Sequence, residues 1–265
     1  MVDGLHLALL GVAAAAGGAV NALAGGGTLI TFPALLAAGI PPLTANVTNT
    51  VALCPGYLGA ALAQRADLVT QRGWMRRTLP AALLGGFAGG SLLLMTGERI
   101  FDALVPYLIL FAAGLVAVQE PLRAWLLRRA DAAGGPAGGT TPLAGAEAAS
   151  ARWAVPAVGA TAVYSGYFGA GASVIILAGL GLTLGGPLPR INALKQTLAL
   201  ASNVAAALLF VFTGPVAWRP VLVMAVATFA GGTLGGRLAG RMSPVWLRRV
   251  VVVIGVVAGF AYLAR

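Results

Sequence analysis

A single lysine offers the clearest chemistry in this sequence. Lys195 is the only lysine among the 265 residues and lies in the segment Arg-Ile-Asn-Ala-Leu-Lys-Gln-Thr-Leu-Ala-Leu (190–200). A cation at the centre of a membrane helix costs at least ~2.5 kcal/mol unless it is paired or faces water. Because no acid lies nearby in the sequence, we expect an anionic ligand as its partner. The alternative is a lysine near the membrane surface whose ammonium reaches lipid headgroups.

Side-chain amides accompany the lysine. Asn192 lies three residues before Lys195, Gln196 follows it, and Asn46 and Asn49 repeat the three-residue spacing earlier in the chain. Residues three apart share one face of a helix. These amides are suited to capping helices or joining neighbouring helices, and equally to lining a polar cavity that orients an anion. The sequence leaves both roles open.

Two glycine-rich breaks interrupt apolar stretches and would supply backbone donors. They read Ala-Gly-Gly-Gly-Thr over 24–28 and Phe-Gly-Ala-Gly-Ala-Ser over 168–173. A helix that begins inside a membrane presents free N–H groups and a partial positive charge, both of which attract an anion. We therefore predict two half-helix N-termini that converge on the anion. The residues expected there are Gly25, Gly27, Thr28, Gly169, Gly171 and Ser173.

The residue types argue against catalysis and against a metal site. All seven acids lie in loops or at the ends of apolar segments, His6 is the only histidine, and Cys54 is the only cysteine. These residues provide no carboxylate pair, no metal-ligand cluster and no histidine that could activate a serine. We therefore expect neither an enzyme nor a cofactor. The absence of acids at membrane depth also disfavours a carboxylate proton relay or a carboxylate sodium site.

Composition places the chain in a membrane. Apolar residues make up 59% of the sequence and charged residues only 9%, with a mean hydropathy of +0.90. Soluble domains carry about 25% charged residues. The net charge of +10 comes from arginines that lie mostly between apolar segments, so they indicate membrane topology rather than nucleic-acid binding. We expect a multi-pass membrane protein with the lipid bilayer as its surroundings.

The two halves of the chain resemble each other. At a separation of 146 residues Asn46 matches Asn192, and a GGxxGG pattern over 85–90 matches another over 231–236. The glycine breaks match at a separation of 144, so the second half carries two additional residues. These paired glycines are spaced for close helix packing. We therefore predict an internal repeat whose GGxxGG residues have a structural role.

Arginine positions indicate that the two halves are inserted in opposite directions. Four arginines fall in the 64–77 loop of the first half, whereas in the second half the four-arginine cluster lies one loop later, at 237–249. If basic loops are cytoplasmic, this shift requires an inverted repeat with an odd number of crossings per half. The predicted fold is all-α, with two inverted repeats, each a glycine-broken or re-entrant helical hairpin plus three transmembrane helices. The repeats span 1–119 and 153–265, a cytoplasmic linker with a flexible middle spans 120–152, and both termini lie outside.

Several of these segments together resemble the sulfite exporter TauE/SafE family. The first-half pattern is Gly25-Gly-Gly-Thr-Leu-Ile-Thr-Phe-Pro33, followed by Ala45-Asn-Val-Thr-Asn-Thr-Val-Ala and Pro55-Gly. The second half has Gly-Tyr-Phe-Gly-Ala-Gly over 166–171 and Asn-Ala-Leu-Lys over 192–195, with fewer glycines than the first. The resemblance covers nearly all of the chain except the linker.

The resemblance implies a carrier of the inner (cytoplasmic) membrane for small sulfur-containing anions such as sulfite, sulfonates or sulfoacetate, and it leaves the direction of transport open. The resulting hypothesis is a secondary transporter that works by alternating access, in which the substrate-binding residues are those of the two glycine breaks together with the lysine and the amides. A non-transporting membrane scaffold or assembly subunit, and an anion channel, are the alternatives. A homodimer is one assembly that the sequence leaves open.

Overall fold

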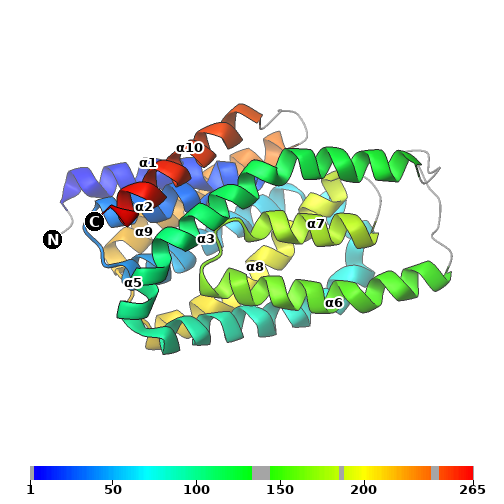
Figure 1. Ribbon diagram of the computed structural model, residues 1–265, viewed down its shortest axis with the longest axis horizontal. Coiled ribbons are helices and arrows are strands. Elements are labelled where there is room, and N and C mark those ends of the chain that lie inside the picture. Colours follow the sequence, from blue (N-terminus) through cyan, green and yellow to red (C-terminus); the bar gives the residue numbers. More distant parts are fainter. Residues whose placement is uncertain (1–2, 133–143, 185–187, 240–244, 265) are drawn as a thin grey trace.

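The structure is a computed structural model that describes residues 3–132, 144–184, 188–239 and 245–264. Within these ranges every regular element is a helix, so the all-α prediction is confirmed (Figure 1). The elements are α1 (Gly4–Leu23), α2 (Thr28–Ala37), α3 (Pro42–Ala63), α4 (Arg65–Leu68), the 3-10 turn η1 (Val69–Gln71), α5 (Arg72–Ala132), α6 (Ala144–Tyr167), α7 (Ala172–Leu184), α8 (Leu188–Thr213), α9 (Trp218–Leu238) and α10 (Val245–Leu263).

Five helical stretches in the described ranges are long and apolar enough to cross a membrane, which confirms a multi-pass membrane protein. The longest stretch, Arg72–Leu122, lies within α5. Helix α5 kinks sharply at Gly97, where φ is 74° and ψ is 167°, a conformation that favours glycine. The kink divides α5 into arm one (72–96) and arm two (98–132), which run in different directions (Figure 1). α5 therefore supplies two membrane helices rather than one.

Each half begins with a helical hairpin broken by glycine. Helix α1 ends at Leu23 and α2 follows from Thr28, while α6 ends at Tyr167 and α7 follows from Ala172. With 10 and 13 residues, α2 and α7 are too short to cross a membrane alone, because a crossing takes about 20 residues. The predicted broken hairpins are thus present in both halves.

Helices of each half pack on helices of the other half. The first helix of each half lies along a glycine-bearing helix of the other half: α1 along α9, and α6 along arm one of α5. A Cβ atom on Gly231 would overlap the backbone of Ala15, and one on Gly85 would overlap the backbone of Gly159, which is 144 positions after Ala15. Backbones that approach this closely require small residues. The GGxxGG residues therefore have the packing role predicted for them.

A second pair of helix contacts also joins helices of one half to helices of the other half. Helix α3 packs on α9, where a Cβ on Gly232 would overlap Gly56, and α8 packs on α5, where a Cβ on Gly86 would overlap Ser202. Positions 56 and 202 are 146 apart, which is the separation of the sequence repeat. The sequence repeat therefore has a counterpart in how the helices pack.

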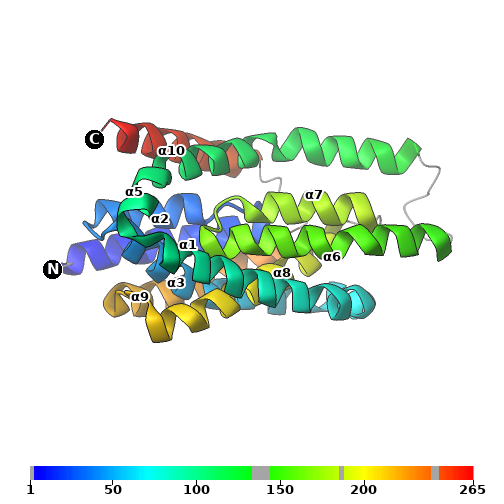
Figure 2. The ribbon, with the colours of Figure 1, turned by 60° about the horizontal axis from the view of Figure 1, so that its bottom comes forward.

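Helices α1 and α6 run along the molecule in opposite directions. Helix α1 starts at the end of the molecule marked N, whereas α6 starts at the other end and runs back towards it (Figures 1 and 2). Both chain termini are marked at the same end. Helices α5 and α6 extend into both ends of the segment expected as a linker (120–152), and its middle (133–143) lies outside the described residues.

Polar contacts hold α10 to arm two of α5 near both ends. Arg248 forms an ion pair with Glu120, and the Tyr262 hydroxyl donates a hydrogen bond to the Asp102 carboxylate. The side chain of Arg248, which the sequence placed with the arginines of a cytoplasmic loop, is only 5% exposed. The two helices are consequently antiparallel, and they are joined near both ends of α10.

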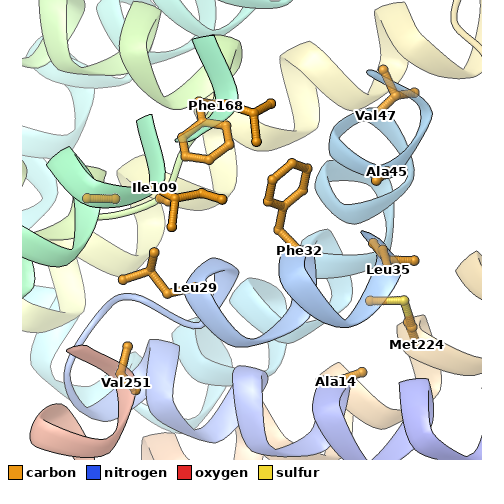
Figure 3. Packing of buried hydrophobic residues seen from close by; sticks show 14 of the residues in the cluster. Ala14, Leu29, Phe32, Leu35, Ala45, Val47, Ile109, Phe168, Met224 and Val251 are labelled. Atoms are coloured by element: carbon orange, nitrogen blue, oxygen red, sulfur yellow. The ribbon is translucent and has the colours of Figure 1, made fainter. Parts of the chain in front are cut away.

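Aromatic residues fill the space between the two hairpins (Figure 3). The Phe32 ring from α2 meets the Phe168 ring from the second break edge-on, with centroids 5.3 Å apart. Phe101 from arm two of α5 packs against Phe168 and Tyr167. Edge-to-face contacts of this kind are a favoured geometry for aromatic pairs. They place the second break firmly beside the first hairpin.

Candidate functional site

The two glycine breaks come together inside the bundle. A Cβ atom on Gly25 would lie 2.5 Å from the Cβ of Ser173 at the start of α7. The side chain of Tyr57, from α3, lies close to both Asn21 and Ser173. The N-terminal ends of α2 and α7 are therefore neighbours, although they lie about half the chain apart in sequence.

Three backbone amides at these two helix starts, those of Gly27, Thr28 and Ser173, have no backbone acceptor within the described residues. In α2 the first amide with a backbone partner is that of Leu29, which donates to Gly26 O at 2.9 Å, so the amides of Gly27 and Thr28 are left over. In α7 the amides of Ala172 and Val174 find acceptors, whereas that of Ser173 does not. Helix N-termini with free amides carry a partial positive charge. This arrangement suits an anion.

The first break depends on glycine for its backbone conformation. Gly25 has φ of 68° and Gly26 has φ of 120°, and the Gly25 amide closes the end of α1 by donating to Val20 O and Asn21 O. The Gly26 amide is 3.4 Å from the side-chain oxygen of Asn21. Gly169, with φ of 78°, closes α6 in the same manner. The breaks are therefore built alike in the two halves.

Lys195 lies inside the bundle rather than at its lipid-facing surface. Its side chain is only 1% exposed. It shares a face of α8 with Asn192, three residues earlier, which contacts the end of α1, and with Ala199, one turn further on, which packs in a cluster with Tyr57. No hydrogen bond or ion pair joins Lys195 to any residue of the described ranges. A buried ammonium in this setting needs an anionic or polar partner.

Two amides of α8 cap the end of α1. Gln196 Nε2 donates to Ala22 O at 3.0 Å and to Asn21 O at 3.2 Å. Asn192 Nδ2 donates to Gln64 Oε1 at 2.7 Å and lies 3.4 Å from Ala22 O. Carbonyls at a helix end would otherwise lack donors. In this conformation the Gln196 amide donates to the end of α1, and the Asn192 amide donates mainly to Gln64.

An amide of α3 does the same for the second break. Asn46 Nδ2 donates to the Tyr167 carbonyl at the end of α6, at 2.8 Å. The side-chain oxygens of Asn46, Asn49 and Gln196 are buried and have no hydrogen-bond partner in the described part of the chain. Of the two roles that the sequence left open for these amides, holding helices together is the one whose contacts are visible for Asn46, Asn192 and Gln196.

Sequence reasoning missed three contributors to this region. Tyr57 joins the two breaks, Gln64 accepts a hydrogen bond from Asn192, and Ser165 is paired with Asn203. The repeat carried a signal for two of them. Position 57 matches Asn203 at a separation of 146, and position 21, beside Tyr57, matches Ser165 at 144. Polar contacts recur at equivalent places even where the residue types differ.

The site is closed to its surroundings. Asn21, Thr28, Ser173, Lys195 and Gln196 are each at most 5% exposed. The polar groups gathered there are amides, hydroxyls, backbone N–H groups and one ammonium. Such a set binds an anion by charge and hydrogen bonding without any change of covalent bonds. A closed site of this kind has to open before a ligand can enter or leave.

Comparison with known proteins agrees with this architecture. The family model "Sulfite exporter TauE/SafE" matches residues 9–262. The chain is 27% identical to the "Probable membrane transporter protein YfcA" of Escherichia coli strain K12 over 257 residues, covering 97% of this chain and 89% of that protein. It is 29% identical to the "Probable membrane transporter protein ORF9" of a Sinorhizobium species over 261 residues, covering 97% and 92%. These matches extend over both hairpins and all the membrane helices, and the chain belongs to the sulfite exporter TauE/SafE family.

Proposed function

We propose that this protein is a secondary transporter that moves small sulfur-containing anions, of the sulfite, sulfonate or sulfoacetate type, across the cytoplasmic membrane by alternating access. One observation carries the proposal. Lys195 is only 1% exposed, lies three residues after Asn192, which contacts the end of α1, and pairs with no carboxylate of the described residues. An oxyanion would supply the missing charge and would accept hydrogen bonds from the free amides at the starts of α2 and α7.

In this proposal the site residues divide into two roles. Lys195 supplies the charge, and the glycine breaks supply backbone N–H groups together with the hydroxyls of Thr28 and Ser173. The side-chain amides orient the anion indirectly, because three of them hold the ends of α1 and α6 in place. The residues of the two breaks are Gly25, Gly27, Thr28, Gly169, Gly171 and Ser173, and the amides are Asn46, Asn49, Asn192 and Gln196.

Alternating access is supported by the relation between the halves. The matched glycine contacts and the opposite directions of α1 and α6 are what an inverted repeat would give. In such a repeat the two halves exchange conformations, so that one arrangement opens the site to one side and the other arrangement to the opposite side. The closed site fits an intermediate between these arrangements. The sulfur chemistry and the cytoplasmic membrane are supported by the family and by its bacterial relatives.

Replacing the lysine tests the proposal. Purified Lys195→Ala protein in liposomes is expected to lose at least tenfold of its sulfite flux, while its size-exclusion profile matches that of the unchanged protein. Arg219→Ala, which removes an exposed cation, serves as the matched control and is expected to keep the flux. Unchanged flux in the Lys195 variant would refute the assignment.

The same preparation separates the alternatives. A scaffold subunit would show neither flux nor a change of thermal stability with sulfite, sulfate, sulfonates or carboxylates. A channel would show flux that rises without saturation and without exchange of labelled anion. The proposed carrier is expected to saturate, to exchange, and to gain stability with its substrate.

A further inference from the structure

Two buried amide oxygens of α3, three residues apart in sequence, have no partner in the described part of the chain. Asn46 Oδ1 and Asn49 Oδ1 belong to side chains that are 0% and 1% exposed, and no donor of the described residues reaches either atom. The orientation of Asn46 is fixed, because its nitrogen donates to Tyr167 O. Buried acceptors of this kind are almost always satisfied in proteins. Something other than the described side chains is expected to meet them.

A neighbouring hydroxyl on α3 is directed elsewhere. The Thr50 hydroxyl donates to the Asn46 backbone carbonyl rather than to a side-chain oxygen. The end of α6 adds negative rather than positive character, because the last carbonyls of a helix carry a partial negative charge. The carbonyl end of α6 therefore favours a positively charged occupant.

The repeat shows what occupies the equivalent place in the other half. Asn46 matches Asn192, and Asn49 matches Lys195, both at a separation of 146. Asn192 reaches the end of α1 just as Asn46 reaches the end of α6. Helix α8 therefore carries a cation, Lys195, three residues after the asparagine that reaches the end of α1, whereas α3 carries the neutral Asn49 three residues after the asparagine that reaches the end of α6.

We propose that Asn46, Asn49 and the carbonyl end of α6 form a binding site for a monovalent alkali cation, in the half whose sequence has Asn49 where the other half has Lys195. Alkali ions prefer oxygen ligands, and amide and backbone oxygens supply them here without a net negative charge. A divalent ion would call for carboxylates. Broken helices in membrane carriers offer such ions their carbonyl ends. The site does not depend on the proposed anion, and its test needs none.

The test compares the thermal stability of the purified protein in sodium, potassium and choline chloride at equal concentration. With sodium or potassium at about ten times its dissociation constant, the melting temperature is expected to rise by about 3–6 °C in a saturable manner, and with choline it is not. Asn49→Ala is expected to abolish the rise. Thr228→Val, which removes a different buried hydrogen bond to Ala52 O, is the matched control and keeps it.

Two further variants separate the effect of this cation site from that of the proposed anion transport. Asn49→Lys puts a resident cation in both halves, and its stability is expected to be independent of the salt used. Lys195→Ala is expected to keep the cation-dependent rise even where anion flux is lost, which separates failure of this site from failure of the proposed transport. Absence of a rise with both alkali ions, or a rise that survives in Asn49→Ala, would overturn the proposal.

Discussion

Substituting alanine for Gly25 probes the contact between the two breaks. Two costs can be worked out from the structure. Gly25 has φ of 68°, and an L residue in that left-handed conformation costs about 1–2 kcal/mol. The new Cβ would also lie 2.5 Å from Ser173 Cβ and 3.2 Å from its hydroxyl oxygen, and overpacking of this kind costs about 1–3 kcal/mol. We therefore expect Gly25→Ala to lower the free energy of unfolding by about 2–5 kcal/mol.

Gly39 provides a matched control. It has φ of 80°, but a Cβ there would meet no atom within 4 Å, so Gly39→Ala should cost only the conformational part, about 1–2 kcal/mol. Adding Ser173→Gly to Gly25→Ala removes the overlapping atoms and should recover the packing part. The interaction between the two substitutions is then measured as the departure from additivity.

Unfolding in mixed detergent micelles by increasing SDS gives these free energies, and sulfite flux in liposomes gives the functional effect. Gly25→Ala is expected to lose flux together with stability, because the displaced Ser173 lies at the start of α7. If Gly25→Ala costs no more than Gly39→Ala, or if Ser173→Gly brings no recovery, the two breaks do not touch and the proposed anion site loses its geometry.

Three further predictions follow from contacts elsewhere in the bundle. Gly232→Ala should lower the melting temperature because α3 and α9 must separate, whereas Gly114→Ala, with open space around the new Cβ, should leave it unchanged or raise it slightly. Gln196→Leu should lower the free energy of unfolding in SDS titrations by about 1–2 kcal/mol, since the end of α1 loses donors; no loss would mean that the cap is dispensable. Glu120→Gln should destabilise the protein more than the double variant that also carries Arg248→Met, because only the single variant leaves a buried cation unpaired; equal thermal stability of the two would contradict the ion pair.

Much of the fold could be predicted from local signals. Glycine in the 24–27 and 168–171 segments predicted where helices break, and low charge predicted the membrane, because both effects depend on a few residues at a time. The sharp turn at Gly97 was not predicted as a kink within a continuous helix, since its sequence, Thr-Gly-Glu-Arg, resembles an ordinary loop. The inverted orientation remains a prediction, supported by the matched packing of the two halves.

The candidate site was harder to predict because its contacts join distant parts of the chain. The sequence indicated that Lys195 and the glycine breaks matter, but not that Gly25 would touch Ser173 or that Tyr57 would lie beside both hairpins. Nor could it decide whether Asn192 faces an anion or a helix end, since an amide suits both. Such choices depend on helix positions that only the folded bundle defines. The roles proposed for these residues in binding stay predictions.

The contacts between arm two of α5 and α10 have a consequence for motion. Asp102 and Arg248 stand at equivalent positions of the two halves, 146 apart, yet carry opposite charges, and each is tied to the far end of the other helix. Because arm two belongs to one half and α10 to the other, the pair of helices links the two halves. We expect the two helices to move together as one rigid body. A displacement of either hairpin would then be transmitted to the other hairpin, and the two hairpins could not move outward at the same time.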